Sequence, residues 1–194
     1  MVGPMTSFEL PEEIDPKVRD VVLCFTYGSK ISLNATRIMK LAYLAELRAI
    51  ETWGRRLTTA EFKHWNYGPW SSDVALAMEG VPELRVEVKE TSKGRKGKFF
   101  HRTQQSATLS SLTEEEADLL KGVLSYWEHV PNDRLVEVTK KSPPFIWTEF
   151  GDAIPFEEYE DFAARLRRAR DDTLEEVIEL NSKEDVRAFV KNLN

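Results

Sequence analysis

The sequence predicts a mainly α (α+β) fold, a compact helical domain with a buried central helix and one small antiparallel β-hairpin or sheet. The first observation is a helical pattern over residues 34–53 whose apolar side chains cover more than half of the helix circumference. An arc this wide indicates burial on several sides. The second observation is a change to a period of two over residues 84–103, which is typical of strands.

The 194 residues are expected to form three parts. Residues 1–13 contain three turn-forming residues and no periodicity, which favours a loose leader. Residues 14–166 are expected to form the helical domain, with the hairpin at 84–103. Residues 167–194 are expected to form a C-terminal amphipathic helical extension.

The first helix is expected to start at Asp15 or Pro16 and to stop near Gly28. The central helix follows from Asn34 to Trp53, and Gly54 suits the left-handed residue just beyond a helix. A narrow polar strip on the central helix is predicted to consist of Arg37, Lys40, Arg48 and Glu51.

Glu46 lies in the middle of the apolar arc of the central helix. A buried carboxylate needs hydrogen bonds or a charged partner, or its pKa must rise. We interpret Glu46 as a structural residue, paired with an arginine such as Arg55 or Arg56, since no second catalytic group accompanies it in the sequence.

The segment from Trp65 to Trp70, with the sequence WNYGPW, is predicted to form a sharp corner. Proline excludes the preceding residue from helical backbone and suits a first helical turn itself, so a helix is predicted from about Pro69 to Met78. Aromatic rings gathered at a corner either plug the core or bind a protein partner. Both alternatives stay open for Trp65, Tyr67 and Trp70.

The period-two region predicts a hairpin with one buried face, in which Leu84, Val86 and Val88 point to the same side. Its glycine-rich tip is basic. The tip cations Lys93, Arg95, Lys96 and Lys98 are therefore candidates for contact with a partner or with nucleic acid. A lysine-rich tip also keeps edge strands soluble, so nucleic-acid contact is not favoured.

Further helices are predicted from local signals. Thr113 and Glu116 fit a capping box, and Pro131 breaks the helix that follows. A short helix through Leu135 and Val138 ends at residues 142–144, an aromatic connector of residues 145–150 follows, and Pro155 starts the last core helix. The extension carries two apolar stripes, which are expected either to pack on the domain or to bind a partner. They are Leu174, Val177 and Ile178, then Val186, Phe189, Val190 and Leu193.

The composition of the chain argues against several classes of function. The net charge of −6 and the pI near 5.3 argue weakly against nucleic acid as the main partner. No apolar run approaches the roughly 18 residues that span a membrane, and the single cysteine, Cys24, excludes an internal disulfide, so we expect a cytoplasmic protein. His64, His101 and His129 share no metal-ligand spacing, and no catalytic, metal or cofactor site is predicted.

Two blocks of the sequence resemble the SocA-like antitoxin family, also called the Panacea domain and described as phage-associated GepA-like proteins. The first block is the run from Lys40 to Glu46 (KLAYLAE), then Gly54, Leu57-Thr58 and the corner from Trp65 to Trp70. The second block comprises Leu112 to Glu115, Leu135 to Thr139, Pro144, Trp147 and Ile154. Lys140 stands where the family usually has a histidine, which puts any role of that histidine in doubt here. The resemblance covers about residues 30–164.

The resemblance implies a helical fold in which Lys40, Tyr43, Glu46, Gly54, Gly68, Pro69 and Trp147 are motif residues. It also implies a non-enzymatic antitoxin of a toxin–antitoxin system, as in phage defence, that binds a cognate toxin stoichiometrically. An adaptor role, presenting the toxin to a protease with or without a chaperone, stays open. The alternative from the hairpin is a winged-helix-like DNA-binding regulator.

Overall fold

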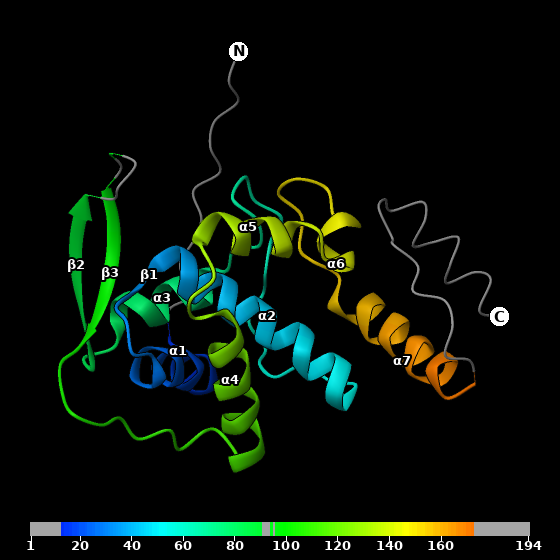
Figure 1. Cartoon of the computed structure of the whole chain (residues 1–194), viewed down its shortest axis with the longest axis horizontal. Helices are drawn as coiled ribbons and strands as arrows, with labels where there is room; N and C mark the ends of the chain where they lie inside the picture. The colour runs from blue at the N-terminus through cyan, green and yellow to red at the C-terminus, as the bar shows by residue number, and fades with distance from the viewer. Residues whose placement is uncertain (1–12, 91–93, 95, 173–194) are drawn as a thin grey trace.

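The central helix α2 organises the protein. The computed structural model describes residues 13–90, 94 and 96–172, and α2 runs through their centre as Ala35–Trp53 (Figure 1). Asn34 caps its start by accepting from the Arg37 amide, and Gly54 ends it at a φ of 71°. Because α2 contacts α1, α3, α4, α5, α7 and two strands, most of its surface is buried, as the wide apolar arc predicts.

Six further helices complete the helical domain in the described part of the chain. They are α1 (Pro16–Gly28), α3 (Ser72–Gly80), α4 (Glu114–Trp127), α5 (Asn132–Lys140), α6 (Pro143–Ile146) and α7 (Phe156–Asp172). The predicted start of α1 is confirmed, with Asp15 accepting from two of its amides, and so is the capping box of Thr113 and Glu116 at the start of α4. The expected aromatic connector is wrong in part, because Pro143 at the first helical position starts the short helix α6.

Two residues of the predicted polar strip are buried instead of exposed. Arg37 donates to the carbonyl oxygens of Trp127 and Glu128 at 3.0 and 2.6 Å, at the end of α4. Lys40 is also buried, whereas Arg48 and Glu51 are exposed as expected. The strip prediction fails because chain segments far away in the sequence supply carbonyl groups that satisfy the buried cations.

Glu46 is buried and ties the turn after α2 to the helix. Its carboxylate accepts from the amides of Leu57 and Thr58 at 2.9 and 3.0 Å and from the Thr58 hydroxyl. Arg56, one of the two predicted partners, lies 3.5 Å away. Burial raises the pKa of Glu46, while Arg56 and the hydrogen bonds oppose that rise. Through these hydrogen bonds, the Glu46 carboxylate fixes the turn that follows α2.

The sheet contains three strands and not only the expected hairpin. β2 (Leu84–Glu90) and β3 (Lys96–Arg102) pair antiparallel, and β1 (Leu33–Asn34) pairs with β3 on its other side, giving the order β1-β3-β2. The predicted buried face is wrong beyond Leu84, since Val86 and Val88 are exposed. Toward its tip the hairpin projects away from the helices, so none of the described helices covers those two valines (Figure 1).

The last described helix, α7, completes the core. Phe156, Tyr159 and Phe162 of α7 are buried, and Trp147 packs edge-on against Phe162 at a centroid distance of 5.6 Å. The helix continues beyond residue 166, and Arg167 donates to carbonyl oxygens at the end of α2. None of the described helices is long and apolar enough to cross a membrane. The two apolar stripes predicted at 174–193 lie outside the described residues.

Candidate partner-binding surface

The corner of residues 65–70 lies over a buried lysine. Lys40 extends from α2 toward the corner, and its ammonium donates to the carbonyl oxygen of Pro69 at 2.7 Å. Burial, with a smaller contribution from the charge of Lys140, lowers the pKa of Lys40 to about 7. The lysine that opens the first motif block therefore holds the proline of the corner in place.

Gly68 is required at the corner for two separate reasons. Its φ of 84° lies in the left-handed region that side chains disfavour. A Cβ added there would lie 3.1 Å from the Thr139 hydroxyl and 3.3 Å from the Lys40 amine. The two motif blocks meet at this point, since Thr139 comes from α5 and Lys40 from α2.

The corner is also tied to its neighbours through backbone groups. The Gly68 amide donates to the Trp65 carbonyl at 2.9 Å, and Lys63 and Trp70 exchange backbone hydrogen bonds at 2.7 and 3.0 Å. Lys140 donates to the carbonyl oxygen of Asn66 at 3.2 Å. Lys140 thus contacts the corner from α5.

The helix after the corner starts later than predicted. α3 begins at Ser72, capped by the Ser71 hydroxyl, which accepts from the Val74 amide. Trp70 cannot join the helix because it pairs with Lys63 in a two-residue bridge. The prediction from Pro69 identified the corner correctly and placed the helix three residues too early.

The three corner aromatics occupy different environments. Tyr67 is 64% exposed, whereas Trp65 and Trp70 are half-buried and Trp70 packs against the core. The Trp65 ring stacks on Phe150 at a centroid distance of 4.9 Å and an angle of 21°. Phe150 is itself 57% exposed. We call Trp65, Tyr67 and Phe150 the corner patch.

Sequence reasoning missed Phe150 as part of this surface. Phe150 lies 80 positions or more from the corner. The pairing of residue 63 with residue 153, together with backbone hydrogen bonds between residues 62–64 and 151–154, brings the two segments together. His64 supports the same junction, because its Nδ1 lies 2.7 Å from the Thr148 carbonyl and its ring lies 3.9 Å from that of Phe145. The signal available in the sequence was the aromatic connector of residues 145–150.

The remaining motif residues, Tyr43 and Trp147, are buried and have structural roles. Tyr43 is fully buried, and its hydroxyl lies 2.7 Å from that of Ser142, which links α2 to the start of α6. Trp147 is buried beside α7. In the described part of the chain, no group of three or more His, Cys, Asp or Glu side chains could hold a metal ion.

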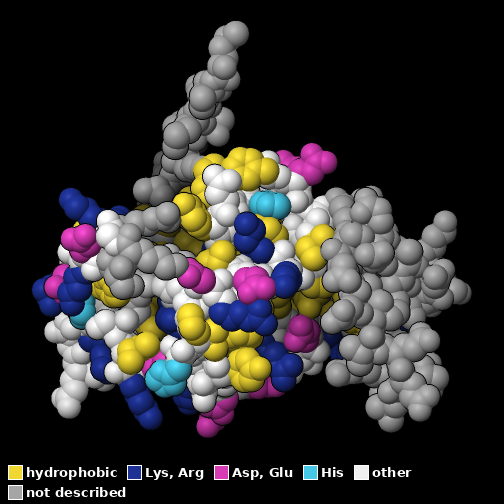
Figure 2. Space-filling model, turned by 45° about the horizontal axis from the view of Figure 1, so that its top comes forward, with side chains coloured by type: hydrophobic (Ala, Val, Ile, Leu, Met, Phe, Trp, Pro, Cys, Tyr) yellow, Lys and Arg dark blue, Asp and Glu magenta, His cyan; other side chains and the backbone are white. Residues whose placement is uncertain are grey.

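The basic hairpin tip lies apart from the corner patch, because the hairpin projects from one edge of the protein (Figure 1). Lys93 and Arg95 lie outside the described residues. Lys96 is exposed at the start of β3, and Lys98 is paired with Glu79 at 2.6 Å. On the face shown in Figure 2, the described cations are interspersed with acidic and hydrophobic side chains. A role of the tip in partner or nucleic-acid contact stays a prediction.

The comparison with protein families gives one match. The family model described as "Antitoxin SocA-like, Panacea domain" matches residues 38–148, which is more than half of the chain. This range contains Lys40, the whole corner and Thr139. A search of curated proteins and a search of solved structures each found no match.

Proposed function

The chain belongs to the SocA-like antitoxin family (Panacea domain), and from this premise we propose that it neutralises a cognate toxin by direct stoichiometric binding through the corner patch. Membership supports an antitoxin role and implies a toxin as partner. It also favours a non-enzymatic regulator. The binding mode and the surface are the proposed steps.

One observation carries the proposal: exposed aromatic rings stand on a backbone that buried groups hold in place. Tyr67 and Phe150 are the rings most open to solvent at this end of the protein. The backbone beneath them is fixed by Lys40 through the Pro69 carbonyl. Stacking against Phe150 restrains Trp65 as well.

Such an arrangement suits tight binding of a protein. Aromatic side chains lose little conformational entropy on binding, and a few of them supply most of the affinity of many interfaces. Lys140 next to the patch adds a positive charge whose ammonium can also meet an acidic group of the partner. The expected partner surface is therefore an apolar hollow with an acidic rim.

The test uses the product of the gene next to this one as the candidate toxin. Co-expression should restore growth that the candidate toxin alone arrests, and the two proteins should co-purify in a defined molar ratio. The purified components alone should then lose toxin activity at that ratio. A toxin that binds but stays active until a protease is added would support the adaptor form instead. Failure to co-purify or to restore growth contradicts the proposal.

A further inference from the structure

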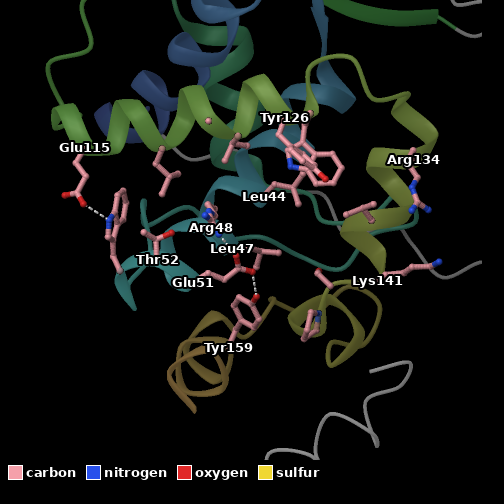
Figure 3. Close-up of a pocket in the computed structure, with 18 residues that line it drawn as sticks. Leu44, Leu47, Arg48, Glu51, Thr52, Glu115, Tyr126, Arg134, Lys141 and Tyr159 are labelled. Atoms are coloured by element: carbon pink, nitrogen blue, oxygen red, sulfur yellow. Dashed lines mark hydrogen bonds and ion pairs between the residues drawn. The ribbon is translucent and has the colours of Figure 1, made fainter. Parts of the chain in front are cut away.

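An open groove of about 930 Å³ runs between α2, α4, α5 and the start of α7 (Figure 3). It is separate from the corner patch, since none of the three patch residues lines it. Its apolar lining comes mainly from α2, α4 and α5. These residues are Leu44, Leu47, Leu119, Val123 and Val138.

Gly122 of α4 lines this groove and has no structural need to be glycine. A Cβ added there would meet nothing within 4 Å, and its φ is not among the positive values. Glycine inside a helix is destabilising relative to alanine. Its missing side chain leaves the backbone of α4 open to the groove, which suits the close approach of another chain segment.

The two ends of the groove carry opposite charge. Glu115 lies at one end, where it accepts from the Trp53 indole at 2.8 Å. Arg134 and Lys141 lie at the other end (Figure 3), with exposed fractions of 57% and 70%. Both cations also contact Glu137. A complementary helix would present acidic groups to the Arg134 end and a basic group to the Glu115 end.

We propose that this groove binds residues 184–193 of the same chain as an amphipathic helix. In helical form, this segment would line up four apolar side chains at i, i+3, i+4 and i+7, the spacing of helices that bind in grooves. They are Val186, Phe189, Val190 and Leu193. The segment starts with Glu184 and Asp185 and carries the cations Arg187 and Lys191 after them, so its acidic start and basic remainder follow the charge order of the groove.

The chain can reach the groove from α7. Arg167 donates to the carbonyls of Ile50 and Glu51 at 2.8 and 3.0 Å, beside the residues of α2 that line the groove. The eleven residues 173–183 span up to roughly 36–40 Å when extended. A ten-residue helix is about 15 Å long, close to the stretch of α4 from Glu115 to Tyr126. The tether also raises the effective concentration of the segment at the groove.

Hydrogen–deuterium exchange of the full chain tests this inference without any toxin, so its outcome is separate from that of the toxin proposal. The expected result is that amides of 186–193 exchange about tenfold or more slowly than in an unstructured chain. Gly122→Trp fills the groove without a clash at Cβ and should abolish this protection. Phe189→Asp should abolish it too.

The matched control is Ala188→Asp, which adds the same charge on the opposite side of the helix and should keep the protection. Free exchange of 186–193 in the unaltered chain would overturn the inference. So would protection that survives both Gly122→Trp and Phe189→Asp. Protection that disappears on dilution would assign the groove to a second copy, and groove protection that appears only with the toxin would assign it to the toxin. Either result overturns docking of the chain's own segment.

Discussion

The corner at residues 65–70 and the hairpin of β2 and β3 both present exposed side chains, yet they are held in different ways. Buried side chains from two helices reach the backbone of the corner, with Lys40 bonded to Pro69 and Thr139 packed against Gly68. The hairpin is held mainly by its own ladder and by Leu84 and Phe100 at its base. Rigidity at a surface thus depends on the groups that lie beneath it, which favours the corner as a preorganised binding surface.

The strongest test of this difference replaces one glycine in each region. Gly68 and Gly94 both have positive φ, of 84° and 69°, but only Gly68 is crowded. Gly68→Ala should destabilise the protein by roughly 2–5 kcal/mol, from the disfavoured backbone together with contacts to Lys40 and Thr139. Gly94→Ala should cost about 1–2 kcal/mol from the backbone alone. Urea unfolding measures both, and equal losses would contradict the account of the corner.

The buried lysine predicts a pH dependence that the hairpin lacks. Burial lowers the pKa of Lys40 from 10.5 to about 7 in the folded protein. Between these two values the unfolded chain binds a proton that the folded chain does not, so stability rises with pH by up to about 1.4 kcal/mol per unit. Below pH 7 both states are protonated, and the contribution stays at its minimum.

Lys40→Met should remove this rise, as read from urea midpoints at pH 7.5 and 9.5. The control is Lys30→Met, which alters an exposed lysine and should leave the rise in place. A rise that persists in Lys40→Met would show that another group causes it.

The smallest stability effect is expected at the hairpin tip. Replacing Lys93, Arg95, Lys96 and Lys98 with glutamine should shift the free energy of unfolding by less than about 1 kcal/mol, because exposed charges contribute little. The Lys98–Glu79 pair is about half-exposed on both sides and fits this expectation. Unfolding of the variant under native conditions would show that the tip is packed and would remove the contrast with the corner.

Local signals made much of the fold predictable. The helix starts at Asp15 and Asn34 and the Thr113–Glu116 capping box depend on residues a few positions apart, and the structure confirms them. Burial of Lys40 was not predictable, because its acceptor is the carbonyl of Pro69, 29 positions away. The two-residue strand β1 carries no periodicity and forms only by pairing with β3.

Part of the candidate site could likewise be predicted from local patterns, and part could not. Tyr67 and its fixed corner follow from the pattern of glycine and proline, whereas Phe150 joins the patch through a long-range pairing that no local pattern encodes. Trp70 was a candidate for partner contact, and its half-buried ring packs against the core. Truncating Trp70 would therefore change stability together with any binding, which makes Tyr67 and Phe150 the better probes.

The central claim is that the corner patch binds the toxin, and the affinity of patch variants tests it most directly. Tyr67→Ala and Phe150→Ala should each weaken the complex with the candidate toxin by about 2 kcal/mol or more, measured by titration calorimetry. Ile31→Ala truncates an apolar side chain that is 43% exposed and lies outside both the patch and the groove, and it should leave the affinity within about 0.5 kcal/mol. Near-UV circular dichroism verifies that each variant is folded. Folded Tyr67→Ala and Phe150→Ala proteins that bind as tightly as the unaltered chain would contradict the claim.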